Sequence, residues 1–543
     1  MKIKIATPDV VIDKIKEIPS IYKITFIASV IFAAVVHGMG FINFFFNEDS
    51  INRWNFFVRV GFSARGAWFI DVIRIASTWG YSVPWIHGVQ IVIALGLMCA
   101  FIVKILDIKS IIFALLSSFL IIAFPAMAFT FVYNFTMHIF MWGMFFAVFA
   151  VYLTERYKFG FIVGALSLML SLALYQAYIG LTIGLILILI MKYLYRADSS
   201  YLTTLKYSAK FLLMGILGGI FYYISVRISF AILNIQATSY AGLDTMGQVP
   251  IRDLPSLIIG SFQGYFQFFF FDRFLTNTNT IQNLYYIFFA LIVLNIFIAI
   301  WRRKVKLSKI FGILGILIIL PIGLNIIEII AHQAFIHPLM HLQFILTFPL
   351  LFSLIDDNLN SDMIEKECEN FKNVINLKRW LVVIVAVMLC SQFHAHTGVY
   401  YLKLYVYRER TTSFYTRLLT HIETTDGYRQ NIPLIIHGFF GEGSLLIDDH
   451  RRDQRLGFRP SIVQFPEITG DTLSRGQFVG FTSPRFQRGH TYFPVWMGVY
   501  FPSVPADRRA EILSSEEFLN MPAWPIPGSV MVIDDVMVVR LSR

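Results

Sequence analysis

The sequence predicts a mainly α-helical, polytopic membrane protein with about eleven transmembrane helices and a small C-terminal α/β domain. Its 543 residues are 57% hydrophobic and only 15% charged, whereas soluble globular chains are about 45–50% apolar and about 25% charged. Apolar runs long enough to span a bilayer recur from residue 21 to residue 398. The basic residues behind the net charge of +11 are spread over short connections between these runs. That pattern is typical of cytoplasmic loops and argues against a nucleic-acid partner.

The apolar runs define the spans in chain order. The second begins after Ser82-x-Pro84, a cap followed by proline in the first helical turn. The fifth and sixth are joined only by Tyr175-Gln176-Ala177. The expected spans lie near residues 21–44, 84–104, 110–132, 137–155, 159–175, 178–195, 209–235, 283–300, 310–331, 341–355 and 380–397.

The basic connections predict the orientation. The links 155–158, 192–210, 301–309 and 372–379 all fall on one side, which the positive-inside rule makes cytoplasmic. The segment before the first span has no small-residue cleavage site, so we interpret it as a retained cytoplasmic tail. Residues 1–398 then form a transmembrane domain whose loops 45–82 and 236–282 lie outside, together with a histidine-rich turn.

Residues 399–543 change character and predict an outside α/β domain. We expect a helix near 411–424, a strand at 432–438 and a helix near 506–519. In the closing VMVIDDVMVVRL, apolar alternation is interrupted by Asp534-Asp535, which is a hairpin signal. The domain has no cysteine, so it offers neither a disulfide framework nor a cysteine metal site.

Two adjacent carboxylates, Glu48 and Asp49, follow the first span directly. One interpretation is a helix start capped by Asn47, where the helix dipole favours acids by about 0.3–1 kcal/mol. The other is a general base that meets a hydroxyl acceptor at the membrane edge, as a lipid-borne donor arrives from the bilayer. The predicted topology places further polar groups on the same face and favours the catalytic interpretation. It does not choose between the two carboxylates.

Arginines near the acid pair, Arg53 and Arg65, suit the phosphate of such a donor, because a guanidinium binds phosphate bidentately. Snorkelling to the membrane interface is the structural alternative. Arg227 and Glu328 stand within apolar runs, where a charge costs at least about 2.5–3.5 kcal/mol and therefore marks a functional candidate. An ion pair between two spans is the alternative there.

Polar residues near the ninth and tenth spans form a second group. Asn325, Glu328 and His332 share one helical face by their spacing of three and four residues. His337 and His341 are four apart, which can hold zinc on a helix, but there is no HExxH context. Hydrogen bonding to a polar substrate or lipid head is the favoured role for this turn.

Four short motifs carry a family resemblance. They are the acidic NEDS at residues 47–50, the Arg65-Gly66-x-Trp68 step, the YQAYIG turn that begins at Tyr175, and the closing PIPGSVMVIDDVMVVRL. With them, the chain resembles the bacterial serotype-converting O-antigen glucosyltransferases, which are often phage-encoded. The resemblance implies a GT-C-like enzyme of the bacterial inner membrane that takes glucose from undecaprenyl-phosphate glucose on the periplasmic face and adds it to the O-antigen of lipopolysaccharide.

The expected site residues combine the motifs with the polar groups above. Asp49 and Glu48 are the catalytic candidates. The substrate-binding candidates are Arg53, Arg65, Trp68, Tyr175, Gln176, Arg227, Glu328, His332 and His337. No metal ligand is assigned, and a divalent-metal requirement stays open.

Other functions remain as alternatives. A transporter or flippase of lipid-linked sugars is expected to have matching halves and broken helices, and the sequence suggests neither. An O-antigen polymerase or ligase would keep the enzyme class but join whole repeats. The absence of a nucleotide-binding signature suits a donor activated elsewhere. The expected partners are the bilayer, polyprenyl-phosphate glucose, the O-antigen acceptor, a small flippase and a polyprenyl-phosphate glucose synthase.

Overall fold

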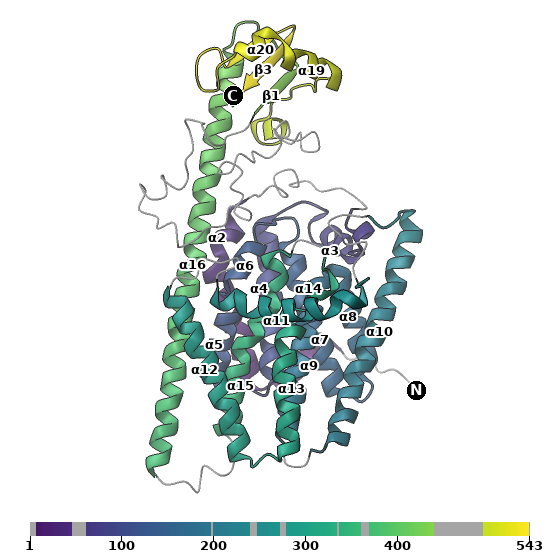
Figure 1. The fold of residues 1–543 in the computed structure, drawn as a ribbon, viewed down its shortest axis with the longest axis vertical. Helices are drawn as coiled ribbons and strands as arrows, with labels where there is room; N and C mark the ends of the chain where they lie inside the picture. Colours follow the sequence, from purple (N-terminus) through teal and green to yellow (C-terminus); the bar gives the residue numbers. More distant parts are fainter. Residues whose placement is uncertain are drawn as a thin grey trace.

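A computed structural model describes residues 7–45, 61–196, 199–238, 247–271, 279–333, 336–359, 369–438 and 492–541. It shows a helical bundle with a small sheet-containing unit beyond one end (Figure 1). We call that end of the bundle the upper end and the opposite end the lower end.

The bundle contains both long and short helices. Its longer helices are α1 (Pro8–Lys16), α2 (Ser20–Ile42), α3 (Phe69–Thr78), α4 (Pro84–Ile105), α5 (Ile111–Ile122), α7 (Met137–Arg156), α8 (Gly160–Leu174), α9 (Ile179–Leu194), α10 (Tyr201–Leu233), α11 (Leu254–Phe270), α12 (Asn279–Arg302), α13 (Leu307–Leu324), α15 (Thr347–Leu359) and α16 (Glu369–Glu423). Its short segments are η1 (Ser63–Arg65), α6 (Pro125–Thr130), η2 (Gln176–Tyr178), η4 (Ile251–Asp253), α14 (Ile327–Ile330) and η5 (Pro338–Leu346).

Within the described residues, nine helical segments are long and apolar enough to cross a membrane. They are α2, α4, α7, α9 with η2, α10, α12, α13, η5 with α15, and residues 376–402 of α16. The other two predicted spans correspond to α5 and α8, apolar helices of 12 and 15 residues. The span predicted near 110–132 is divided, because Pro125 cannot continue α5 and instead begins α6. The predicted mainly α, polytopic membrane class is confirmed.

Small residues allow neighbouring helices to approach closely. A Cβ built on Gly88 of α4 would lie 2.7 Å from the Phe41 side chain of α2. A Cβ on Gly164 of α8 would lie 2.7 Å from the Ala150 carbonyl oxygen of α7. Such contacts are typical of membrane bundles, where dispersion rather than water exclusion drives helix association.

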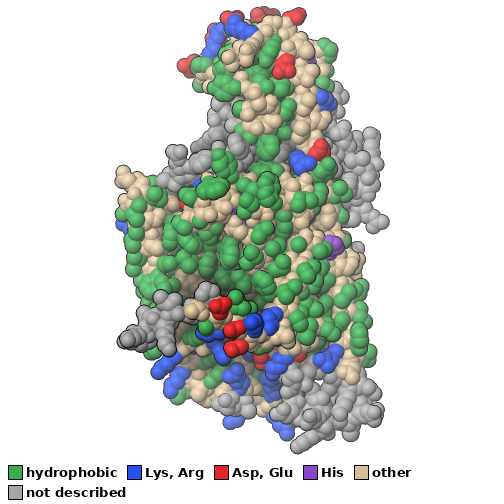
Figure 2. Space-filling view, turned by 180° about the vertical axis from the view of Figure 1, so that it is seen from behind, with side chains coloured by type: hydrophobic (Ala, Val, Ile, Leu, Met, Phe, Trp, Pro, Cys, Tyr) green, Lys and Arg blue, Asp and Glu red, His purple; other side chains and the backbone are tan. Residues whose placement is uncertain are grey.

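The lateral surface of the bundle is largely apolar (Figure 2). On α10, for example, only 6% of the most apolar 18-residue window is buried inside the protein. Lys and Arg gather instead at the lower end (Figure 2). The apolar belt is the surface expected of a chain that faces lipid over the length of its spans.

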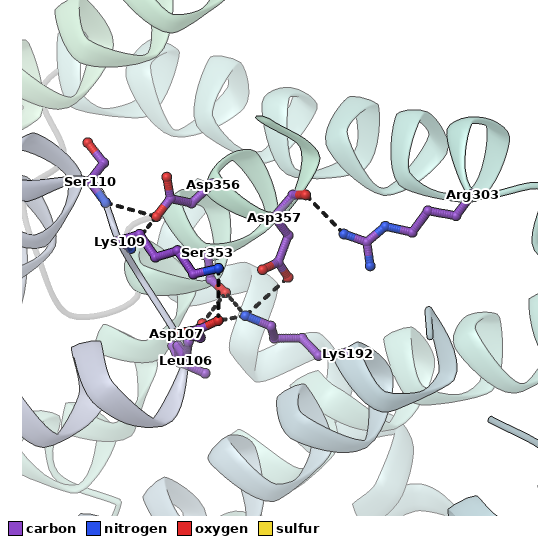
Figure 3. Close-up of polar contacts among 9 residues, drawn as sticks. All are labelled: Leu106, Asp107, Lys109, Ser110, Lys192, Arg303, Ser353, Asp356 and Asp357. Atoms are coloured by element: carbon purple, nitrogen blue, oxygen red, sulfur yellow. Dashed lines mark hydrogen bonds and ion pairs between the residues drawn. The ribbon is translucent and has the colours of Figure 1, made fainter. Parts of the chain in front are cut away.

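A partly buried ion pair connects several elements at the lower end (Figure 3). Lys192 Nζ of α9 lies 3.1 Å from Asp357 Oδ2 of α15. The same ammonium donates to Ser353 Oγ at 2.5 Å and to the Leu106 carbonyl oxygen. The neighbouring Asp356 accepts from the backbone N–H groups at the start of α5. These contacts fix the turn between α4 and α5 against the ends of α9 and α15.

The C-terminal unit begins on the same helix that crosses the bundle. The helix expected near 411–424 is the end of α16, which extends for 55 residues without a proline. Beyond it lie β1 (Leu434–His437), the π-helical turn η7 (Phe493–Met497), α19 (Ala506–Ser514), α20 (Glu516–Asn520), β2 (Val530–Ile533) and β3 (Val536–Arg540). The helix expected near 506–519 is therefore two helices, because Ser515 is extended and caps α20.

The sheet has the strand order β1-β3-β2. β1 pairs in parallel with β3, with Leu434 opposite Met537, and β2 pairs antiparallel with β3. Asp534 and Asp535 connect β2 to β3 with positive φ angles of 46° and 67°. Two successive left-handed residues are the geometry of a tight hairpin turn, so the predicted hairpin is confirmed.

Candidate active site

The two candidate catalytic acids, Glu48 and Asp49, and the nearby Arg53 lie outside the described residues. The described residues on either side of this segment are Phe45 and Gly61.

Both flanks of the segment 46–60 contact one buried turn between α6 and α7. On the first flank, the Phe45 carbonyl oxygen accepts from Asn134 Nδ2. On the second, the Phe62 ring packs against Phe135, with ring centroids 6.2 Å apart. The Phe45 ring also stacks on Tyr401 of α16 at 6.0 Å. The segment that carries the acid pair thus leaves and rejoins the described structure at the same place on the upper end.

Arg65 and Gly66 lie in a tight turn whose backbone is hydrogen-bonded by the Gln176 side chain. Gly66 has a φ of 79°, a left-handed conformation that costs an L side chain about 1–2 kcal/mol. Gln176 Nε2 lies 2.9 Å from both the Arg65 carbonyl oxygen and the Tyr222 hydroxyl oxygen, and donates to each. The Arg65 guanidinium lies 5.9 Å from the centroid of the Phe62 ring. The structure therefore brings together Arg65 and Gln176, two of the candidates proposed from sequence.

Trp68 lies beside this turn and forms a hydrogen bond with α10. Its indole Nε1 donates to Ser225 Oγ at 3.0 Å. In the same region, the Thr238 backbone N–H donates to the Ala64 carbonyl oxygen at 3.1 Å. The upper part of α10 thus holds the stretch that follows the acid pair.

Tyr175 connects this turn to the second polar group. Its ring packs against Phe140 at 4.9 Å and against Tyr178 at 5.1 Å. It also packs on a small apolar cluster of Ala177, Ile327 and Ala331. Tyr175 and Gln176 therefore lie between the Arg65 turn and the region of Glu328.

The helix near Glu328 is interrupted, so the prediction that Asn325, Glu328 and His332 share one helical face is wrong. α13 contains Pro321 and ends at Leu324, and α14 has only four residues. Pro321 lies within α13, and the chain leaves the helix at Asn325, whose backbone N–H still donates to the Pro321 carbonyl oxygen. The sequence also suggested no broken helix, and that expectation is wrong as well.

The side chains of Glu328, His332 and His337 have different neighbours. Glu328 Oε1 lies 3.8 Å from His341 Nε2. His337 Nε2 lies 3.4 Å from the Tyr133 hydroxyl. Within the described residues, His332 Nδ1 is buried and has no hydrogen-bond partner.

The zinc spacing of His337 and His341 is not realised on an α-helix. The residues that follow His337 form the 3₁₀ helix η5, in which residues four apart do not share a face. Among the described residues, there is no group of three or more His, Cys, Asp or Glu side chains that could hold a metal ion.

α11 covers the interrupted helix. Ser261 Oγ donates to the Asn325 carbonyl oxygen at 2.9 Å, and Asn325 Nδ2 donates to the Ser261 carbonyl oxygen at 3.0 Å. A Cβ on Gly264 would lie 2.7 Å from Glu328 Oε1, so only glycine allows this approach. Asn325 Oδ1 and Gln343 Oε1 are buried without a partner among the described residues. Carboxylate and amide oxygens here form a region rich in hydrogen-bond acceptors.

Arg227 does not join these groups. It is exposed on the upper half of α10. It remains a candidate on its position in an apolar helix alone.

Four residues at the upper end, three of them buried and Asp71 partly buried, were not identified from the sequence. Arg74 Nη2 donates to Asp71 Oδ1 at 3.0 Å on α3, and the Arg74 side chain is only 3% exposed. Burial raises the pKa of Asp71, although the Arg74 guanidinium opposes that shift. His87 of α4 and His138 of α7 stack with ring centroids 3.8 Å apart. Titratable residues inside apolar runs were the available signal.

The chain matches the family model described as Glucosyl transferase GtrII over residues 38–354. The match covers more than half of the 543 residues. It extends from the upper half of α2 into α15 and includes the segment 46–60 and the candidate site residues described in this section. No curated protein and no solved structure matches the chain.

Proposed function

The chain belongs to the glucosyl transferase GtrII family, and we propose that it transfers glucose from undecaprenyl-phosphate glucose to O-antigen at the periplasmic face of the inner membrane. The observation that carries the proposal is the family match over the spans and the upper-end turns. Candidate polar side chains from several elements, among them Arg65, Gln176 and Glu328, lie at the upper end of the bundle. A membrane-embedded sugar donor and a polar acceptor can meet at such an end.

Charge asymmetry supports the orientation. The lower end carries Lys and Arg from almost every connection, and these residues are Lys104, Arg156, Lys158, Lys192, Arg196, Lys206, Arg302, Arg303, Lys304, Lys306, Lys378 and Arg379. Excess positive charge marks the cytoplasmic side. The upper end, with the C-terminal unit, is then periplasmic.

The chemistry we propose is a single displacement. The carboxylate of Asp49, assisted or replaced by Glu48, removes the proton of an acceptor hydroxyl. The hydroxyl oxygen then forms a bond to the anomeric carbon of glucose, while the bond from that carbon to the phosphate oxygen breaks. Undecaprenyl phosphate leaves with the bonding electron pair. Arg53 and Arg65 bind the phosphate and stabilise the charge that develops on it.

The other candidates are proposed to bind substrate. Gln176 and Tyr175 lie between the Arg65 turn and the acceptor-rich region of Glu328. Carboxylate and amide oxygens accept hydrogen bonds from sugar hydroxyls, which suits Glu328 to a sugar ring. His332 and His337, with Trp68 and Arg227, complete the proposed substrate-binding set.

Transfer by the purified protein tests the proposal. Undecaprenyl-phosphate glucose and a lipid-linked O-antigen acceptor are supplied, with and without a chelator to decide any metal requirement. Asp49→Asn or Glu48→Gln should lower kcat by about 100- to 10,000-fold, the usual contribution of a general base. Asp13→Asn, which neutralises an exposed carboxylate on α1, is the matched control and should retain activity. Full transfer by both acid variants at normal protein levels would exclude this segment as the site.

Sugar analysis of O-antigen made with and without the gene tests the reaction class. A new side-branch glucose supports the proposed transfer. Altered chain length instead identifies a polymerase or ligase, and loss of O-antigen identifies a transporter.

A further inference from the structure

A continuous set of polar contacts begins at Phe45, the last described residue before the segment 46–60. The Phe45 carbonyl oxygen accepts from Asn134 Nδ2. The Asn134 carbonyl oxygen lies 2.8 Å from His87 Nδ1. Because a carbonyl oxygen can only accept, the proton of this bond is on Nδ1 of His87. The first flank of the segment is thereby connected to α4.

The two histidines continue these contacts to α3. The rings of His87 and His138 are almost parallel, with an interplanar angle of 21°. The Thr78 hydroxyl lies 3.3 Å from His87 Nε2, and the Ser77 hydroxyl lies 3.5 Å from His138 Nε2. Both histidines are completely buried. The pair therefore holds the end of α3 against α4 and α7.

The contacts return to the second flank of the segment through α3. Arg74 is paired with Asp71 one turn earlier on the helix. The second carboxylate oxygen of Asp71 lies 3.4 Å from the Ser63 hydroxyl, which donates to it. Ser63 belongs to η1, which ends with Arg65. Both flanks of the segment 46–60 are thus joined by one buried set of polar groups.

Stability alone does not account for these groups. Replacing a buried ion pair by well-packed apolar residues is often neutral or stabilising. His138 Nδ1 is moreover buried with no hydrogen-bond partner among the described residues, which is unfavourable. These groups are costly to bury, and they join two separate parts of the chain. Their role is better explained by the positions in which they hold the two flanks of the segment.

We propose that Asp71, Arg74, His87 and His138, with Asn134, form a positioning network that holds both ends of the acid-bearing segment for catalysis. This inference rests on the proposed function, in which Glu48 and Asp49 act as the base. None of the five residues touches the reacting atoms in this scheme. They act by fixing where the segment leaves and rejoins the bundle. A displacement of about 1 Å at a reacting group can lower a rate by about 100-fold.

The test compares two double variants that each neutralise a partly buried ion pair. The first, Asp71→Asn with Arg74→Gln, is called the α3 variant. It keeps hydrogen-bonding groups in place and leaves no unpaired buried charge. Lys192→Gln with Asp357→Asn does the same at the lower end and is the matched control (Figure 3). Each is purified, its unfolding midpoint is measured, and kcat and KM are determined with undecaprenyl-phosphate glucose and the lipid-linked acceptor.

We expect the α3 variant to lower kcat on the order of 100-fold while KM for the donor changes little. The lower-end control, with a comparable change in unfolding midpoint, should keep kcat within about threefold of wild type, because distant sites act independently. The α3 variant should also cause little further loss in whichever of Glu48→Gln or Asp49→Asn retains measurable transfer, since residues that act as a unit are not additive.

Three results would overturn the inference. One is a folded α3 variant with the wild-type kcat. Another is an equal loss of kcat in the lower-end control, which would indicate a general effect of stability. The third is a full additive loss in the acid-variant background. Full activity of both acid variants alone would refute the proposed function itself, and that result is read before the α3 variant is made.

Discussion

Gly66→Ala is the sharpest single test of how the Arg65 turn is built. Its φ of 79° is left-handed, and an alanine there costs about 1–2 kcal/mol. The new Cβ would also lie 2.4 Å from the Tyr222 hydroxyl oxygen, so that side chain must move. Movement of the Tyr222 side chain breaks its hydrogen bond with Gln176, and such a bond contributes about 0.5–1.5 kcal/mol. We therefore expect a loss of about 1.5–3.5 kcal/mol in the free energy of unfolding.

A second substitution separates the two causes. Tyr222→Phe removes the oxygen that the new Cβ would meet, and the nearest remaining ring atom lies at 3.5 Å, an ordinary contact. The double variant should therefore be more stable than Gly66→Ala alone, but less stable than wild type. Gly219→Ala on α10 is the control, because nothing lies within 4 Å of its new Cβ. In a helix, that change should stabilise by up to about 1 kcal/mol.

The assay is thermal unfolding of the detergent-solubilised protein followed by circular dichroism, together with transfer kinetics. If Arg65 binds the donor phosphate, Gly66→Ala should raise KM for undecaprenyl-phosphate glucose more than the Gly219→Ala control does. An unchanged unfolding midpoint for Gly66→Ala would refute the strain argument. Failure of Tyr222→Phe to restore any stability would refute the steric one.

Three further predictions concern the lower end and the C-terminal unit. Lys192→Met leaves the partly buried Asp357 without its ion-pair partner and should cost up to about 3 kcal/mol, more than neutralising both partners, as denaturant unfolding would show. Asp535→Gly relieves a φ of 67° in the hairpin turn and, after the greater chain entropy of glycine is subtracted, should stabilise by up to about 1 kcal/mol; a lower unfolding midpoint would contradict this. Burial, with two nearby arginines, lowers the pKa of His437 below its usual value. Its neutral form is favoured by folding, so its contribution to stability is present above about pH 6.5 and is lost as the pH falls through the folded pKa. Unfolding from pH 7.5 to pH 5 should show this loss, and His437→Gln should reduce it.

Much of the candidate site was accessible to sequence reasoning, but only residue by residue. Arg65, Trp68 and Gln176 were named from short motifs, and the structure places them in one hydrogen-bonded region with α10. Tyr222 was not named, because a tyrosine on an apolar helix carries no local signal of its partner. Its contact with Gln176 joins residues 46 positions apart.

Two other features depended on packing rather than pattern. Spacing alone placed Asn325 and Glu328 on one helical face, whereas α13 ends at Leu324, before both of them. His87 and His138 each stand as a lone histidine in an apolar run, and only the fold stacks them at 3.8 Å. Polar side chains in membrane spans are informative as a class, but their partners lie on other helices.

Local sequence patterns were sufficient to predict the membrane class, the order of the spans and the closing hairpin at Asp534-Asp535. These follow from the length of contiguous apolar runs and from local turn chemistry, which neighbouring residues specify among themselves. The contacts among polar groups at the upper end are visible only in the three-dimensional fold. Arg65 contacts Gln176, Glu328 lies near His341, and the buried His87 and His138 stack on each other. These contacts depend on which helix faces pack together. Small residues such as Gly88 and Gly164 allow that packing, because they let helices far apart in the chain approach closely.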